Sequence, residues 1–149
     1  MSKGNLPEVF LDTDVAFDII SKREPHYIHS GRLLELSAEG RITLLIAESS
    51  RANLIYLSFD IYKLPDAASR LLDFTGACHV IHGGKPAMIE ALTSPFTDKE
   101  DAMQYFTAFH SGVDYFLTRN TRDYKHSSPL LPVYTPQEFL EGPGASDRE

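Results

Sequence analysis

Acidic and amide side chains fall at three separate places along the chain where they could hold a divalent metal ion. Asp12 directly follows a short apolar run that has the composition of a buried strand. Asp98 and Asp101 stand three residues apart at the start of an expected helix, so their side chains share one face of it. Asn120 and Asp123 follow a further apolar run. Because all these groups offer hard oxygen ligands, they suit magnesium or manganese better than zinc.

Basic side chains near the last of these groups could hold the phosphates of a substrate. Arg119, Arg122 and Lys125 surround the end of an apolar run, and Arg51 opens a long expected helix. The alternative for this basic cluster is a solvated loop. Together with a divalent ion, which activates water and neutralises developing charge, the pattern favours metal-assisted phosphodiester hydrolysis.

Each acidic group also has a purely structural interpretation. Asp12 could cap the helix that follows it, and the first turn of that helix explains Asp14 better than a site does. Thr97-Asp98-Lys99-Glu100 matches a capping box, which accounts for the acids within it. Asp101 is explained less well, because its apolar neighbours place this helix against the core and a carboxylate there needs a partner or an ion. The last amide–acid pair could be turn residues.

Length and composition indicate one globular domain. The chain has 149 residues, of which 42% are hydrophobic, and a formal net charge of −7. This charge argues against binding nucleic acid through bulk positive charge, so a metal or a local basic patch is required. The single cysteine, Cys78, excludes an intramolecular disulfide and suits a reducing compartment. No apolar run is long enough to cross a membrane or serve as a signal sequence, and we expect a cytoplasmic protein.

Short apolar strands alternate with helices along the chain, which predicts an α/β fold with a mostly parallel sheet covered by helices. Ligands of such sheets gather beyond the carboxyl ends of the strands, where Asp12 stands. Residues 48–63 are expected to form one long helix, and residues 1–141 one domain. The segment 142–149 is rich in Gly, Pro, Ser and charge and is predicted to be a disordered tail. The expected strands cover 9–11, 42–46, 77–81, 113–118 and 131–134.

Four stretches in the right order and spacing resemble the motifs of PIN domains. They are VFLDTDV at 9–15, FTDKEDAMQ at 96–104, DYFLTRNTRDY at 114–124 and VYTPQEFL at 133–140. The resemblance implies a three-layer α/β/α fold with a short parallel sheet. It also implies an endoribonuclease that depends on magnesium or manganese and cleaves single-stranded RNA. Many small bacterial members are toxins of toxin–antitoxin pairs, are neutralised by a cognate antitoxin and are often dimeric, so an antitoxin and a homodimer are the implied partners.

Carried over by motif, Asp12 is the first metal-binding acid, Asp101 the central one and Asp98 an auxiliary acid. Asn120, with Asp123 behind it, occupies the last acidic position. The resemblance thus implies a metal set of Asp12, Asp98, Asp101 and Asp123.

The helix after the second strand departs from the common pattern. Most members place a glutamate there, whereas this chain resembles the subset with asparagine and places Asn53 at that position. Asn53 therefore joins Asp12, Asp101, Asn120 and Asp123 in the expected catalytic set. The expected substrate-binding residues are Arg51, Thr118, Arg119 and Arg122.

Two other functions stay open at this point. Asn53 and Asn120 reduce the negative charge of the site, so the domain could bind RNA or a protein partner without cleavage. An Asp-nucleophile phosphatase could use Asp12 and Asp14, but the residues that follow do not match the haloacid-dehalogenase pattern. His26 and His29, spaced three apart, are expected to have structural or surface roles.

Overall fold

The computed structural model describes residues 6–148 and contains one five-stranded sheet in the order β3-β2-β1-β4-β5. All four strand pairs are parallel, which confirms the α/β architecture predicted from the sequence. The strands are β1 (Glu8–Leu11), β2 (Thr43–Ala47), β3 (Cys78–Ile81), β4 (Tyr115–Leu117) and β5 (Val133–Tyr134).

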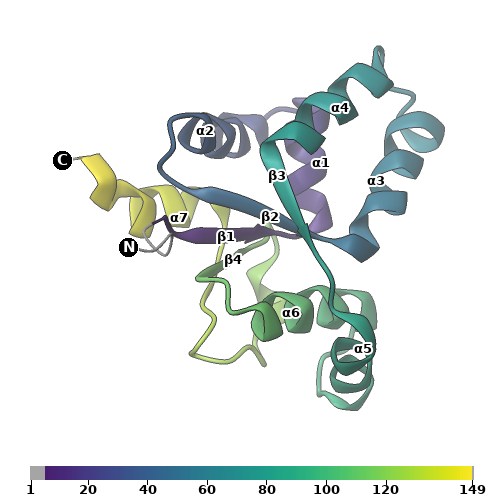
Figure 1. Cartoon of the computed structure of the whole chain (residues 1–149), viewed down its shortest axis with the longest axis vertical. Helices are drawn as coiled ribbons and strands as arrows, with labels where there is room; N and C mark the ends of the chain where they lie inside the picture. The colour runs from purple at the N-terminus through teal and green to yellow at the C-terminus, as the bar shows by residue number, and fades with distance from the viewer. Residues whose placement is uncertain (1–5, 149) are drawn as a thin grey trace.

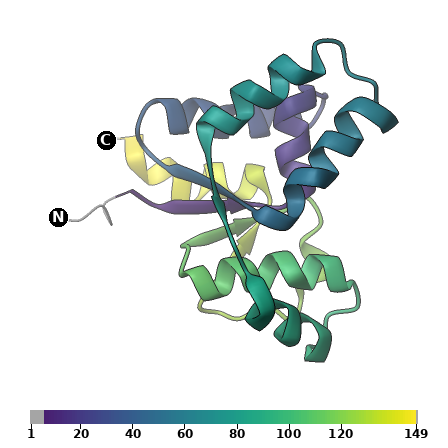
Figure 2. The same ribbon diagram turned by 45° about the vertical axis from the view of Figure 1, so that its right-hand side comes forward.

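Helices cover both faces of the sheet (Figures 1 and 2). The first layer contains α1 (Thr13–Ser21), α2 (Tyr27–Ala38), α3 (Arg51–Tyr56), α4 (Ala67–Ala77) and α7 (Pro136–Glu141), and the second contains α5 (Gly84–Thr93) and α6 (Lys99–Ser111). Short helical turns complete the fold, namely η2 (Glu48–Ser50), η3 (Leu57–Ile61), η4 (Thr121–Tyr124) and η5 (Pro143–Arg148).

The hydrophobic core lies on both sides of the central strand β1. Val9 and Leu11 point into the cluster under α1 and α2, whereas Phe10 points into the cluster under α6 and stacks on Phe116 at 5.1 Å between ring centroids. Since both faces of each central strand are covered, these strands appear in the sequence as continuous apolar runs. This burial fixes β1 rigidly and, with it, the residue that follows.

The chain at 48–63 is helical without interruption from Glu48 to Ile61, as the sequence predicts, but its hydrogen-bond pattern is not that of one α-helix throughout. It is divided into η2, α3 and the π-helical turn η3. In this segment Leu54 is buried, whereas Ile55 and Phe59 are 54% and 47% exposed. The reason is that this segment extends past the sheet, so only one of its faces has a neighbour to pack on.

The end of the chain lies beside α7, and the disordered tail predicted at 142–149 stays a prediction. Residues 143–148 form η5, which folds back on α7, and Gly144 approaches Phe139 so closely that a Cβ there would lie 2.9 Å from its ring. Residue 149 lies outside the described residues. Within 6–148, no helix is both long and apolar enough to span a bilayer.

Candidate functional site

Asp12 is held at the carboxyl edge of the sheet by its own backbone and by the helix that it begins. Its amide donates to the carbonyl of Leu117 at 3.1 Å, which ties it to the neighbouring strand β4. Its Oδ1 accepts a hydrogen bond from the Val15 amide at 3.0 Å, so the side chain caps α1. Asp12 is only 4% exposed. The structural and functional interpretations of Asp12 are therefore compatible, because the cap uses one oxygen and fixes the direction of the other.

Asp101 enters the same region from α6. Asp98 caps this helix, and its Oδ1 accepts from the amides of Glu100 and Asp101 at 2.9 and 3.0 Å. The half-buried Asp101 lies beside the hydroxyl of Tyr124, a residue of η4 that is 2% exposed. That hydroxyl has no hydrogen-bond partner of ordinary length among the described residues.

Burial and mutual repulsion disturb the ionisation of the two acids. Burial is the main cause that raises the pKa of Asp12 to about 7; the Asp14 and Asp101 carboxylates raise it further, while the Thr118 hydroxyl and Val15 amide lower it. Burial also raises the pKa of Asp101 to about 6, with contributions from Asp98, Asp123 and Asp14, whereas Tyr124 lowers it. Acids from three separate segments therefore act on one another at this edge. Clustered carboxylates of this kind are the environment that a cation would stabilise.

A polar cavity of about 450 Å³ opens between α1, α3 and α6 in front of these acids. Asn53 lines it, as expected, and so does the exposed Asp14, which the sequence had assigned a structural role. The full lining is Asp12, Thr13, Asp14, Ser49, Ser50, Asn53, Leu57, Glu100, Asp101, Met103 and Gln104.

A buried polar network behind the cavity was missed by the sequence analysis. Gln104 Oε1 accepts from the Thr13 amide at 3.0 Å, and the Thr13 and Ser50 hydroxyls lie 2.9 Å apart. These residues connect α1, η2 and α6, so the network fixes the three walls of the cavity relative to one another. The only signals in the sequence are the serines directly after the second strand and a glutamine on the helix face that carries Asp101.

The turn after β4 lies next to Asp101 rather than in the cavity lining. Asn120 Nδ2 donates to Asp123 Oδ2 at 2.8 Å, and the Asn120 amide donates to Thr118 Oγ1 at 3.2 Å. Asp123 nevertheless raises the pKa of Asp101, and Thr118 lowers that of Asp12. The structure thus brings Thr118 and Asp123 near the two buried acids, while Asn120 orients Asp123.

Comparison with known proteins identifies the family. A model of the PIN domain matches residues 8–122, which is most of the chain. The chain belongs to the PIN domain family. The match to this family gives no support to the phosphatase alternative.

Solved structures share the fold of this PIN domain. One is the crystal structure of VapBC2 from Rickettsia felis bound to a DNA fragment from its promoter, with a TM-score of 0.64, 18% identity and coverage of 86% of this chain and 98% of that one. Another is DNA-bound VapBC from Salmonella typhimurium, with a TM-score of 0.63, 18% identity and coverage of 88% and 99%. No curated protein matches the chain.

The donor set of this PIN domain fits a hard divalent cation, although the carboxylates do not form a preassembled cage. Within residues 6–148, no three His, Cys, Asp or Glu side chains are grouped closely enough to hold a metal ion by themselves. The donors near Asp12 and Asp101 include amide and hydroxyl oxygens, from Asn53 and Ser50, in the lining of the same cavity. Magnesium tolerates such a site, because it commonly uses one or two carboxylates and keeps several waters.

The four expected substrate-binding residues are distributed over different places. Thr118 lies beside Asp12, and Arg122 is exposed on η4. Arg119 does not line the acidic cavity: its Nε donates to Asp18 Oδ2 at 2.8 Å on the far side of α1. Arg51 pairs with Glu48 at 3.1 Å.

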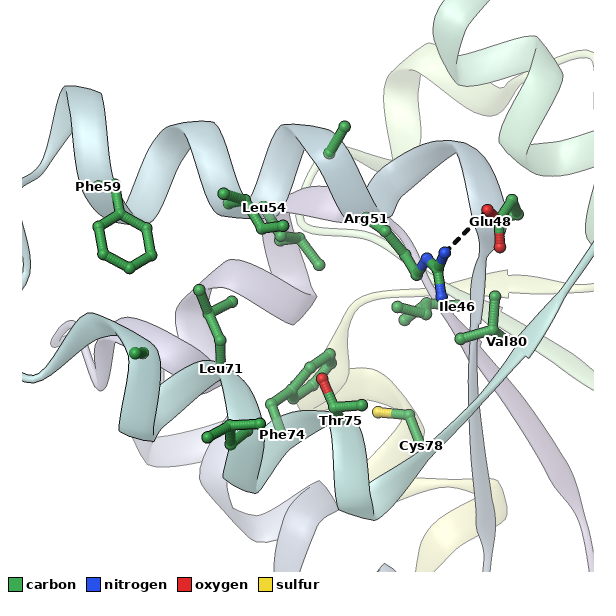
Figure 3. A pocket seen from close by; sticks show the side chains of 14 residues that line it. Ile46, Glu48, Arg51, Leu54, Phe59, Leu71, Phe74, Thr75, Cys78 and Val80 are labelled. Atoms are coloured by element: carbon green, nitrogen blue, oxygen red, sulfur yellow. Dashed lines mark hydrogen bonds and ion pairs between the residues drawn. The ribbon is translucent and has the colours of Figure 1, made fainter.

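Arg51 lies at the rim of a second, mainly apolar cavity of about 650 Å³ between α3 and α4 (Figure 3). In the view of Figure 3, Leu54 and Phe59 face Leu71 and Phe74 across this groove. Its cysteine, Cys78, has its pKa raised to about 12 by burial, so its thiol is not a nucleophile at neutral pH. This groove has no group arranged for phosphodiester chemistry.

Proposed function

We propose that this PIN domain is an endoribonuclease that depends on magnesium or manganese and cleaves single-stranded RNA. The observation that supports this most strongly is the convergence of Asp12, Asp14 and Asp101 on one polar cavity at the carboxyl edge of the sheet, where the buried Asp12 and the half-buried Asp101 have raised pKa values. Buried acids with perturbed ionisation in a cavity are typical of catalytic sites.

In this proposal Asp12 and Asp101 hold the metal ion. Asp98 and Asp123, whose charges act on Asp101, add negative charge around the ion. When bound, the ion lowers the pKa of water and neutralises charge on the scissile phosphate. Asn53 offers a neutral oxygen from α3, in keeping with the subset of the family that has asparagine at this position. Asn120 keeps Asp123 oriented through its 2.8 Å hydrogen bond.

The remaining polar residues would bind and orient the substrate. Thr118 can donate its hydroxyl proton to a phosphate oxygen or a water beside Asp12. Arg122 is exposed on the turn that carries Asp123 and can approach a phosphate next to the cavity. Arg51 pairs with Glu48 and lies at the rim of the α3–α4 groove rather than in the lining of the acidic cavity.

We further propose that the protein is a cytoplasmic toxin controlled by a cognate antitoxin and is able to form a homodimer. The shared fold with the two VapBC structures supports a protein partner, and the free Cys78 suits a reducing compartment. Coexpression with the product of a neighbouring small gene should abolish RNA cleavage by the purified complex.

Cleavage of single-stranded RNA with manganese, and its loss with EDTA, tests the proposed activity directly. Asp101→Asn should remove cutting while leaving the fold intact, since the amide is nearly isosteric. Asp73→Asn, on the exposed surface of α4, is the matched control and should cut normally. Unchanged cleavage by the Asp101 variant would remove that residue from the site.

The second candidate is a PIN domain that binds RNA or a protein without cutting. The neutral Asn53 in the cavity and the neutral Asn120 beside Asp123 favour it, because both lower the negative charge available to a metal. A thermal shift with manganese, together with no cleavage of any RNA tested, would distinguish this binding module from the nuclease.

A further inference from the structure

A second polar cavity lies at the same edge of the sheet as the acidic site. It measures about 300 Å³, and its polar lining is Asp18, His26, His29, Arg119, Thr135 and Gln137. Arg119 directly follows Thr118 beyond the end of β4, and Thr135 follows the end of β5. The acidic cavity instead lies beyond the ends of β1 and β2. Because the strand order is β2-β1-β4-β5, the two cavities are neighbours along one edge.

Arg119 is fixed in this cavity by a buried carboxylate. Its Nε donates to Oδ2 of Asp18 at 2.8 Å, and the Asp18 side chain is only 1% exposed. The two terminal Nη groups of Arg119 make no hydrogen bond to any residue within 6–148. A guanidinium held through Nε presents its remaining N–H groups as a rigid fork, which is the geometry that binds phosphate.

The negative charge of Asp18 does not oppose an anion here, because two arginines neutralise it. Its Oδ1 accepts from Nη2 of Arg23 at 3.2 Å, so both carboxylate oxygens are used. Arg23 also donates from Nη1 to the Tyr62 hydroxyl at 3.0 Å. Asp18, Arg23 and Arg119 together carry a net charge of +1 (−1 + 1 + 1). This local positive charge stands in a chain whose formal net charge is −7.

His26 and His29 add donors to the opposite wall. They lie at the start of α2, which packs against α7 (Figure 1). Neither ring has a hydrogen-bond partner within the described part of the chain. An imidazole N–H is a donor in either tautomer, so both rings can turn a donor toward an anion beside Arg119.

We infer that this cavity is a phosphate subsite, formed by Arg119, His26 and His29, that binds a backbone phosphate flanking the one to be cleaved. The inference rests on the proposed nuclease function and assigns a substrate role to the two histidines. Neighbouring strands are about 4.8 Å apart, so cavities one or two strands apart are separated by roughly 5–10 Å. A single RNA strand running along the carboxyl edge can therefore contact both cavities at once.

The first test is a titration of the full chain with inorganic phosphate, without divalent ions, followed by the NMR signals of the histidine rings. The signals of His26 and His29 should shift and saturate, while those of the exposed His79 and His82 on the distant β3 side should not. No shift at His26 and His29 would overturn the subsite.

The second test measures the Kd of a short single-stranded RNA in EDTA, with each phosphate in turn replaced by a neutral methylphosphonate. The substitution should weaken binding to the wild type by about tenfold at a flanking position, as expected for one charge-assisted contact. In the double variant His26→Gln/His29→Gln, methylphosphonate substitution at this position should no longer weaken RNA binding. The control double variant His79→Gln/His82→Gln should behave as the wild type. Arg119→Lys, which keeps the charge but loses the fork, should show a partial loss.

The outcomes separate the subsite from the proposed activity. If the protein cleaves RNA and the His26/His29 variant binds every modified RNA as the wild type does, the subsite is wrong and the nuclease stands. Phosphate could shift the NMR signals of both histidines while every methylphosphonate substitution has the same effect on RNA binding with and without these histidines. The cavity then binds free anions, and its assignment to the RNA backbone is overturned. If no RNA is cleaved, the proposed activity fails, while the phosphate titration still decides whether the cavity binds the anion.

Discussion

Asp12 caps α1 and has a proposed role as a metal ligand, and burial opposes the negative charge that the proposed role requires. As a cap it accepts from Val15, which either carboxylate or amide can do. As a buried acid it resists ionisation, so its pKa is raised from 3.8 to about 7. The folded protein therefore binds a proton at Asp12 more tightly than the unfolded chain does, and stability falls as the pH rises between these two values.

In the absence of divalent ions, Asp12→Asn should remove the loss of stability that ionisation of Asp12 causes as the pH rises. We expect the variant to be more stable than the wild type at about pH 8, by on the order of 2–4 kcal/mol, and equally stable below about pH 3, where Asp12 is neutral in the folded and the unfolded chain. The measurement is the free energy of unfolding in urea as a function of pH. Asp73→Asn, on the exposed surface, should stay within about 0.5 kcal/mol of the wild type throughout. A destabilisation of Asp12→Asn that is constant with pH would contradict this account.

The hydroxyl of Tyr124 is the buried group that lowers the pKa of Asp101. Tyr124→Phe should therefore raise the pKa of Asp101 further above about 6. Because a metal ligand must be deprotonated, we expect the midpoint for manganese, measured by thermal shift, to rise several-fold at about pH 6 and to approach the wild-type value at about pH 8. Tyr134→Phe, on the strand β5 that pairs with β4, is the control. An equal rise of the manganese midpoint in both variants would show that the Tyr124 hydroxyl does not act specifically on Asp101.

At the level of elements, the alternation of apolar runs and helices predicted all five strands and the position of Asp12 at the carboxyl edge of the sheet. The apolar runs are buried on both faces, and this burial makes them visible in the sequence. The contacts that could not be predicted are those between side chains that are far apart in the sequence. Arg119 turns to Asp18, a residue 101 positions away, and Gln104 meets Thr13 across 91 positions. Ile55 and Phe59 fit a buried helix face by spacing, yet no element covers them.

The hydrogen-bond network around Gln104 connects α1, η2 and α6. Gln104→Met should keep the volume but leave the Thr13 amide and the Ser50 hydroxyl without their acceptor. The expected cost is about 1–3 kcal/mol in the free energy of unfolding, the usual penalty for an unsatisfied buried polar group. Gln137→Met, exposed on α7, is the matched control and should cost less than about 0.5 kcal/mol. Equal stability of the two variants would show that packing, rather than this acceptor, joins the three elements.

At the scale of the whole molecule, the proposed function requires an acidic protein to bind an anionic RNA strand through few contacts. The net charge is −7, and Arg41 and Arg51 are paired with glutamates, so few cations remain for RNA at the carboxyl edge. Arg119 and Arg122, with Lys125 beside them, are the cations that the strand can meet there. The affinity should therefore depend only weakly on salt, unlike that of proteins with broad basic faces.

The salt dependence of RNA binding measures how many phosphates are contacted. For two or three contacts to single-stranded RNA, log K should fall against log salt with a slope of roughly −1.4 to −2.1, in EDTA to prevent cleavage. Arg122→Gln should reduce the steepness by about 0.7, since it removes one contact. Arg41→Gln, just before β2 at the opposite, amino edge of the sheet, should leave the slope unchanged. A wild-type slope steeper than about −4 would mean that RNA follows a wide surface, and the carboxyl edge could not then be the whole binding site.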